Sequence, residues 1–238
     1  MVDVSFIVPA WNEAVGIRAT LDSLRAAGES LGPRWSWEIL VVDNASTDGT
    51  TAVAMASGAR VVPEPHRQIA RARNRGAGEA GGRFLVFVDA DTLVAPELVR
   101  EAVEALVSGA VGGGSILDCP DADPASARVV GLWNRVSVGL GLAAGAFVFC
   151  RREAWAATGG FDETRYAGEE VFFSMALKRW GRARGRDFCV LTDHPVRTSA
   201  RKFSDGWGRL RSLAQMLLLM ACPPLARTRW ACFSWYRR

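Results

Sequence analysis

The sequence lacks the features that would cross-link the chain or carry it through a membrane. Its five cysteines are far apart and odd in number, and no two of them form a CxxC pair. That usage is typical of reduced thiols in a cytosolic protein. No apolar run approaches the roughly 20 residues that a membrane-spanning helix needs. The amino terminus begins directly with a strand pattern, so we expect no signal peptide.

What the chain does contain is enough apolar sequence for a core and an excess of arginine. Of its 238 residues, 49% are hydrophobic, and the formal net charge is +4. This length fits one large domain or two small ones. Arginine suits the planar recognition of phosphate. No basic motif is interleaved with aromatic residues, so we expect no nucleic-acid partner.

The stretch from Phe84 to Asp91 is the one around which we organise the rest. Its five apolar residues, rich in Phe and Val, predict a strand buried on both faces. Asp89 and Asp91 follow at once, where ligands sit in open α/β sheets. Two neighbouring carboxylates are costly unless a cation or a donor relieves them, and oxygen ligands suit Mg²⁺ or Mn²⁺. The alternative is an acidic turn in which Asp91 caps the next helix.

Apolar periodicity predicts an α/β fold along the whole chain. A βαβαβ order at the start implies a parallel sheet with right-handed crossovers. Asn12 is the expected N-cap of the first helix, and Asp48 or Thr47 that of the second. Strands are expected at residues 4–8, 38–42, 59–62, 84–88, 145–150 and 188–191, with a glycine-rich extended stretch at 110–117. Helices are expected from 17 to a stop at Gly28 and Gly32-Pro33, up to 55, from 69, from 96, over 129–142, up to 157, and up to 181.

Two charged segments are candidates for the site. A helix beginning near Ile69 places Arg67, Gln68 and Arg71 around its N-terminus, an end that favours anions. The segment is either a diphosphate site or a solvated basic face. Glu169 and Glu170 stand at the N-terminus of another expected helix, where the helix dipole alone would stabilise them.

The end of the chain differs in composition. The apolar run Leu213–Cys222 is surrounded by arginines and by Trp207, Trp230 and Trp235. The run is too short to span a bilayer, but it suits the plane of the membrane interface. The alternatives are a helix folded back on the sheet or one used in a dimer.

Seven motifs in a fixed order then resemble a known family. They are IVPAWNE (7–13), VVDNASTDGT (41–50), ARARNRGA (70–77), VDADT (88–92), GAFVFCRR (145–152), GGFDE (159–163) and GEEVFF (168–173). Together they resemble a family 2 glycosyltransferase, inverting and of GT-A fold, over about residues 3 to 202. No single motif is decisive, but their shared order is hard to reach by accident.

The resemblance implies a role for each matching residue. Asp43 would hydrogen-bond the base, and Asp89 would contact the ribose or the sugar. Asp91 would hold a divalent Mg²⁺ or Mn²⁺, with His194, after the last strand, as a further metal ligand. The residues implied in donor binding are Pro9, Ala10, Trp11, Glu13, Asp43, Arg71, Asn74, Asp89 and Ala90.

The catalytic base is implied by position. Many family members carry Glu-Asp at the acceptor site, with the second residue as base. This chain has Glu169-Glu170, so Glu170 takes that place, and the extra methylene leaves open which glutamate acts. A base near neutral pH works best with a raised pKa, which burial beside Glu169 would supply.

The resemblance also sets expectations for the whole chain. We expect a GT-A domain over 1–204, with a nucleotide-sugar half (1–92) and an acceptor half (93–204), followed by a basic, aromatic helical segment (205–238). The expected reaction moves a sugar, by default from a UDP-sugar, to the hydroxyl of a sugar or lipid-linked acceptor. We expect a cytoplasmic protein, peripheral at the inner face of the membrane if the last segment binds lipid, or a homodimer if it binds a second copy.

Two other functions are weighed against this one. A sugar-phosphate nucleotidyltransferase usually opens with a glycine-rich loop, whereas Pro9–Glu13 contains no glycine. A non-catalytic nucleotide-sugar-binding protein would be favoured by loss of the D-x-D motif or of both glutamates, and all of these are present.

Overall fold

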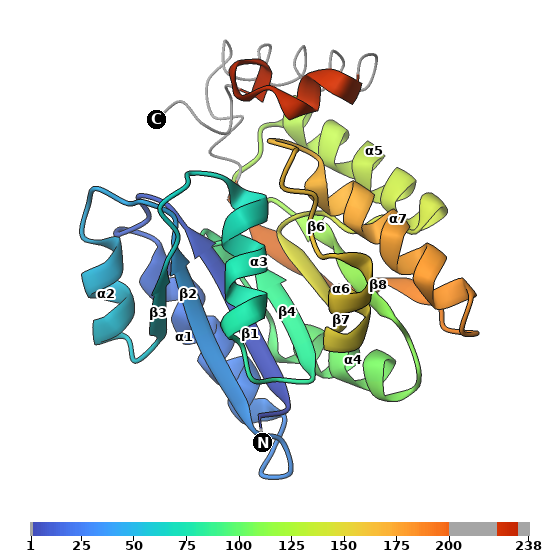
Figure 1. Cartoon of the computed structure of the whole chain (residues 1–238), viewed down its shortest axis with the longest axis horizontal. Helices are drawn as coiled ribbons and strands as arrows, with labels where there is room; N and C mark the ends of the chain where they lie inside the picture. The colour runs from blue at the N-terminus through green and yellow to red at the C-terminus, as the bar shows by residue number, and fades with distance from the viewer. Residues whose placement is uncertain (1, 200–222, 233–238) are drawn as a thin grey trace.

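A computed structural model describes residues 2–199 and 223–232 of the chain (Figure 1). Its strands are β1 (Val4–Ala10), β2 (Trp37–Asp43), β3 (Arg60–Pro63), β4 (Phe84–Val88), β5 (Thr92–Leu93), β6 (Gly112–Asp118), β7 (Phe147–Arg151) and β8 (Phe188–Thr198). Its helices are α1 (Ile17–Ser30), α2 (Thr50–Ala56), α3 (Ile69–Glu79), α4 (Pro96–Val107), α5 (Pro124–Leu140), α6 (Arg152–Thr158) and α7 (Glu169–Arg182), with two 3-10 turns, η2 (Pro223–Arg227) and η3 (Arg229–Cys232).

The strands form one sheet in the order β3-β2-β1-β4-β7-β6-β8-β5. Strands β3, β2, β1 and β4 are parallel, as expected from the βαβαβ pattern, and β6 pairs with β8 in parallel. Strand β7 runs antiparallel to both β4 and β6. The chain order reverses between β1 and β4, which makes the carboxyl ends of these strands the place for a ligand crevice.

Both faces of the sheet are covered, which explains the continuous apolar run of β4. Phe84, Val86 and Val88 pack on the face covered by α1 and α4. Leu85 and Phe87 point to the opposite face, which α3, α6 and α7 cover. Figure 1 shows α3 and α6 in front of the sheet and α1 behind it. The alternation fixes the register of β4 and so the place where Asp89 emerges.

Several predicted boundaries were wrong for identifiable reasons. Helix α1 passes through Gly28, because this glycine packs against Trp37, whose ring lies 2.5 Å from where a Cβ would stand, and it ends at Ser30, just before the predicted stop at Gly32-Pro33. Helix α5 begins earlier than predicted, at Pro124, since Asp123 caps it by accepting from two backbone amides. Glu13 to Gly16 form a turn before α1, so Asn12 is not its N-cap.

Strand β8 is also longer than predicted. It was expected to end at Leu191, but it continues to Thr198. Leu191 pairs with Ser115 and Val196 with Leu117, so residues 192–195 lie at an irregularity of the ladder. Pro195 is tolerated there because a bulge does not require its missing N–H.

The predicted C-terminal helix cannot be compared as a whole. The run Leu213–Cys222, Trp207 and Trp235 lie outside the described residues. The described portion forms η2 and η3, and Trp230 is exposed there. Among the helices in the described ranges, none combines the length and hydropathy required to cross a bilayer.

Candidate active site

A pocket of about 240 Å³ opens at the carboxyl end of β4. Three elements bring acidic or basic groups to it: α3, the turn after β4, and the N-terminus of α7. Helix α5 and the end of β6 contribute apolar groups. The lining residues are Ile69, Arg73, Asp89, Asp91, Leu117, Cys119, Val129, Val130, Trp133, Ala144, Gly145, Ala146, Gly168, Glu169, Glu170, Thr198 and Ser199.

Arg73 is the centre of the charged wall and is almost fully buried, with 1% of its surface exposed. Its guanidinium donates to Glu169 at 2.7 Å, to Asp89 at 2.8 Å and to the carbonyl of Gly145 at 2.8 Å. Burial lowers the pKa of Arg73, but the carboxylates of Asp89, Glu169 and Glu170 outweigh it and leave that pKa raised. Within the described residues its Nε has no hydrogen-bond partner. The network therefore ties both acidic motifs to one buried cation.

The two glutamates of α7 differ in their surroundings. Glu169 is buried and its carboxylate forms an ion pair with Arg73. Glu170 forms no ion pair within the described part of the chain and is more exposed than Glu169. Burial of its carboxyl and then the neighbouring Glu169 raise the pKa of Glu170 to about 8, against the opposing effect of Arg73. Glu170 is thus poised to exchange a proton near neutral pH.

Arg73 is the site residue that sequence analysis missed. The buried face of α3 is made of Ala72, Arg73, Gly76 and Ala77, at helical spacing. Gly76 is needed there because a Cβ would lie 2.4 Å from Ile7. A single long cation in a stripe of small residues is the signal that would have found it, because such a residue is buried only with acidic partners.

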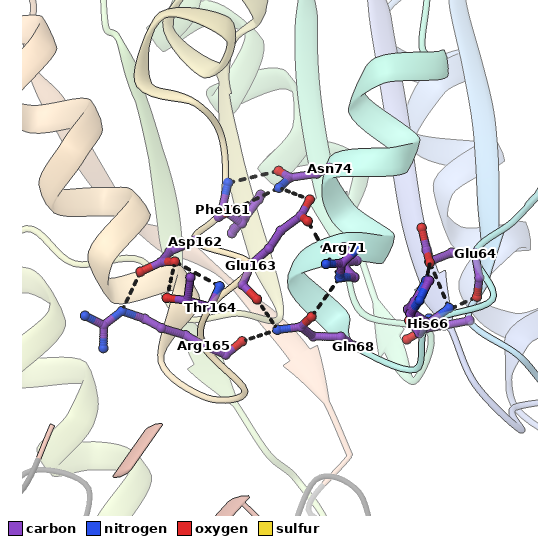
Figure 2. Close-up of polar contacts among 11 residues, drawn as sticks. Glu64, His66, Gln68, Arg71, Asn74, Phe161, Asp162, Glu163, Thr164 and Arg165 are labelled. Carbon is purple, nitrogen blue, oxygen red and sulfur yellow. Dashed lines mark hydrogen bonds and ion pairs between the residues drawn. The ribbon is translucent and has the colours of Figure 1, made fainter. Parts of the chain in front are cut away.

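A loop between α6 and α7 is fastened to α3 (Figure 2). The buried amide of Gln68 donates to the carbonyls of Glu163 at 2.6 Å and Arg165 at 2.8 Å. The Asn74 amide donates to the carbonyl of Phe161 at 2.9 Å and accepts from its N–H at 2.9 Å. These bonds fix the segment that leads into the two glutamates of α7.

The predicted roles of Arg71 and Asn74 in donor binding remain predictions. Asn74 is engaged with the loop, and Arg71 lies 3.6 Å from Glu163 and donates to Gln68 at 3.1 Å. Figure 2 shows both side chains directed to this loop. Neither is among the described residues that line the pocket.

The residues predicted for the nucleotide lie at the neighbouring carboxyl ends of β1 and β2. Ala10 pairs with Asp43 in the parallel register, and Pro9 and Ala10 are buried. The amide of Glu13 donates to Thr50 at 2.8 Å. The guanidinium of Arg67 stacks on the ring of Trp11, 3.1 Å from its centroid. The loops after both strands are therefore joined beside Asp89 and Ala90, which follow β4.

His194 does not reach the pocket. It lies within β8, not after it, and its Nδ1 is 2.6 Å from the Glu101 carboxylate on α4. It is not among the described lining residues, and its role as a metal ligand stays a prediction.

A divalent cation fits the donor set of Asp89 and Asp91. Both carboxylates line the pocket and both are partly exposed. Among the described residues, no group of three or more His, Cys, Asp or Glu is arranged to hold a metal. Mg²⁺ and Mn²⁺ are commonly held by one or two carboxylates, with substrate phosphates completing the shell. Asp89 and Asp91 therefore suit a metal ion whose ligands come partly from the protein and partly from the substrate.

The curled, mostly parallel sheet with an acidic pocket at its switch point defines an α/β protein of GT-A fold. The sequence model of Glycosyl transferase family 2 matches residues 5–128, which are 124 of the chain's 238 residues. The chain belongs to this family.

Curated relatives agree with this placement. ExoO, a succinoglycan biosynthesis protein of Rhizobium meliloti (strain 1021), is 34% identical over 112 residues, 43% of this chain and 29% of ExoO. The glycosyltransferase AglE of Haloferax volcanii is 26% identical over 208 residues, 82% of this chain and 67% of AglE. The pre-mycofactocin glycosyltransferase of Mycobacterium tuberculosis is 26% identical over 84% of this chain and 44% of its own length. The chain thus spans about a third to two thirds of these relatives.

Solved structures share the fold. The mannosyltransferase PcManGT from Pyrobaculum calidifontis, in complex with GDP-Man and Mn²⁺, has a TM-score of 0.68 and 23% identity, over 97% of this chain and 69% of its own. Glucosyl-3-phosphoglycerate synthase from Mycobacterium tuberculosis, in complex with Mn²⁺, UDP and phosphoglyceric acid, has a TM-score of 0.65 and 22% identity, over 94% of this chain and 78% of its own.

Proposed function

We propose that this chain transfers a sugar from a nucleoside diphosphate sugar to an acceptor hydroxyl with inversion. The single observation that carries the proposal is that one pocket holds both a group that can accept a proton and a pair of carboxylates that can bind a cation. Glu170, with a pKa of about 8, lines it together with the acidic pair Asp89 and Asp91. A one-step displacement requires a general base for the acceptor hydroxyl. It also requires stabilisation of the charge on the leaving diphosphate, which a cation held by the acidic pair would supply.

Each chain residue has one task in the proposed step. Glu170 accepts the proton of the acceptor hydroxyl as that oxygen forms a bond to the anomeric carbon. The bond from this carbon to the diphosphate oxygen breaks, and the nucleoside diphosphate leaves with the electron pair. Arg73 is a positioning residue, because it holds Glu169 and Asp89 in fixed places. This arrangement favours Glu170 as base and leaves Glu169 as its electrostatic neighbour.

The donor would lie across the carboxyl ends of β1, β2 and β4. Asp91, with Asp89 beside it, would hold a Mg²⁺ or Mn²⁺, and such an ion neutralises charge on the diphosphate when bound. Metal complexes of the two structural neighbours support this assignment. We assign donor binding to residues 1–92, with Asp43 at the base, and acceptor binding to residues 93–204. His194 is retained as a weaker candidate for the metal.

UDP-sugars are the first donors to test. The neighbour structures hold UDP in one case and GDP-mannose in another, so a panel with both bases is needed. A thermal-shift screen with Mg²⁺ or Mn²⁺ ranks the donors, because a tight ligand raises the melting temperature by mass action.

Substitution of Glu170 tests the proposal. Glu170→Gln removes the base but keeps the shape, so donor binding measured by calorimetry is retained while turnover falls roughly 10²- to 10⁴-fold. Glu104→Gln, on the exposed face of α4, is the matched control and keeps full turnover. Undiminished transfer by Glu170→Gln would show that the base is another residue. In a separate assay, pyrophosphate release from a nucleoside triphosphate and a sugar phosphate would indicate a nucleotidyltransferase.

A further inference from the structure

Helix α5 is inverted relative to a normal surface helix. Its two fully buried residues are Ser126 and Ser137. Leu132 and Leu140, in contrast, are 61% and 59% exposed. A helix on a globular protein normally turns its apolar stripe to the core. The exposed face of α5 is therefore the face that its sequence makes suitable for an apolar environment.

Polar contacts hold α5 in this orientation. The Asn134 side chain accepts from the N–H of Leu117 and donates to its carbonyl, both at 2.9 Å. The buried Ser137 hydroxyl is satisfied locally, since it donates to the carbonyl of Leu142 at 2.6 Å. Asn134 pairs with the end of β6 beyond its ladder with β7, much as a neighbouring strand would. The polar side of α5 is therefore the side that is bonded to the domain.

Five of the seven large apolar residues of α5 form one stripe, which leaves out Val130 and Val138. Val129, Leu132, Trp133, Val136 and Leu140 recur at i, i+3, i+4, i+7 and i+11, which places them along one side of a helix. We call these five residues the α5 stripe. Val129 and Trp133 line the active-site pocket, whereas Leu132, Val136 and Leu140 do not. The stripe is thus continuous from the inside of the pocket to the outer surface.

Basic residues flank the α5 stripe. The segment from Pro124 to Arg152 contains no acidic residue, and Arg128 and Arg135 are exposed on α5. Helix α7 lies beside α5, since the Lys178 ammonium contacts the carbonyl of Leu140. Figure 1 shows the two helices side by side. Exposed Arg179 and Arg182 extend the basic area on α7, beyond the exposed Met175.

We propose that the α5 stripe and its flanking arginines lie on the surface of an anionic lipid bilayer. Apolar side chains with arginines beside them match the boundary between acyl chains and negatively charged head groups. The second part of the inference rests on the proposed function: the acceptor is an amphiphile whose apolar portion reaches the pocket along Val129 and Trp133. The reacting hydroxyl then meets Glu170 while the apolar part stays on α5.

A second copy of the chain is the competing occupant of this face. Symmetric packing of α5 on α5 would bring Arg128 and Arg135 of both copies together with no acidic residue of the helix to balance them. An anionic bilayer satisfies both the apolar and the basic residues. Charge complementarity therefore favours the bilayer.

Vesicle sedimentation with the full chain tests the surface. The chain is mixed with vesicles of phosphatidylcholine and phosphatidylglycerol, and with vesicles of phosphatidylcholine alone. We expect binding to the mixed vesicles, weakened at least about tenfold in Leu132→Ser/Val136→Ser/Leu140→Ser. A control changes three apolar residues elsewhere that are on average more exposed, Val15→Ser/Met55→Ser/Val107→Ser, and keeps full binding.

The contribution of charge is tested in the same way. Arg128→Gln/Arg135→Gln lowers binding to mixed vesicles roughly thirtyfold, because each arginine near an anionic surface adds favourable energy. Arg18→Gln/Arg34→Gln removes the same net charge from other exposed positions and has a smaller effect. Equal losses in the two pairs would mean that net charge, not the α5 surface, governs binding.

The outcomes separate this inference from the proposed function. Transfer to a short water-soluble acceptor, or slow donor hydrolysis, stays unchanged in the α5 triple variant, since its residues lie outside the pocket. Vesicle binding without sugar transfer would contradict the proposed function and would still support the membrane-binding surface. Sugar transfer by a chain that does not bind the mixed vesicles would overturn the inference. Light scattering that shows a dimer lost in the triple variant, with no vesicle binding, would assign the face to a second copy.

Discussion

Helices α3 and α5 line the same pocket with opposite arrangements of polar and apolar residues. Helix α3 turns the charged Arg73 inward among small residues and buries it. Helix α5 turns serines inward and leaves leucines exposed. The pocket therefore has a charged wall, suited to a diphosphate and a proton transfer, and an apolar wall, suited to an acceptor. Each helix departs from the usual pattern where the proposed chemistry needs it.

The charged wall is where the largest effect is expected. Asp91→Asn keeps the size of the side chain but removes the charge that would hold a divalent ion on the diphosphate. We expect metal-dependent transfer to fall roughly 10³-fold, in line with several kcal/mol of lost transition-state stabilisation. Initial rates with and without added Mn²⁺ measure this. Asp22→Asn, exposed on α1, is the control, and equal rates in the two variants would contradict the assignment.

Arg73 provides the next largest effect, on stability. Arg73→Met leaves Glu169 and Asp89 without their shared cation in a buried place, and removal of one partner from such a network costs about 3–5 kcal/mol. Arg75→Met, on the solvent side of the same helix, costs less than about 1 kcal/mol because its ion pair with Glu79 is exposed. Denaturant unfolding of both variants gives the difference. Similar values would show that the network contributes little to the fold.

The pH dependence sharpens the roles of the two glutamates. Because Glu170 acts only as a carboxylate, kcat/KM for the acceptor rises about tenfold per pH unit up to a pKa of about 8 and then levels. Since the folded pKa lies above the unfolded one, folding takes up a proton between about pH 4.3 and 8. The associated stability is present below that window and is lost as pH rises through it.

A pair of melting curves checks that sign. The melting temperature of Glu170→Gln relative to the unsubstituted chain increases as pH rises from 5 toward about 8. Glu104→Gln shows no such trend, because its side chain is exposed. A constant difference across the range would mean that Glu170 titrates normally.

The smallest expected effect belongs to the exposed part of the α5 stripe, outside the pocket. Leu132→Ser on the α5 stripe changes the free energy of unfolding by less than about 0.5 kcal/mol, since the side chain is largely exposed. Leu98→Ala, on the buried face of α4, costs about 2–5 kcal/mol. Chemical denaturation of both variants makes the comparison. A large cost for Leu132→Ser would indicate that part of the chain covers α5.

Local sequence patterns predicted the fold and part of the candidate site. The apolar run of β4 and the two aspartates after it were predicted because burial on both faces and the end of a strand leave a local signal. The first turn of α7 was predicted from its two glutamates and the apolar spacing that follows. The family resemblance, carried by motifs in order, was confirmed by the family match.

The remainder depends on contacts between residues distant in sequence. Arg73 meets Glu169 across 96 positions, and Gln68 meets Arg165 across 97. The Asn74 amide meets the carbonyl of Phe161 across 87 positions. The bond between Asn134 and Leu117, at the end of β6, joins the polar side of α5 to the sheet. Apolar spacing alone predicts which residues share a face, and only tertiary contacts decide which face turns inward.

The central claim is that Glu170 shares a proton with the solvent near neutral pH, beside the ion pair of Glu169 with Arg73. Carboxyl ¹³C chemical shifts, followed against pH and assigned with Glu170→Gln, measure this without any substrate. The account predicts a Glu170 midpoint of about 8. A midpoint near the ordinary glutamate value of about 4.3 would contradict it.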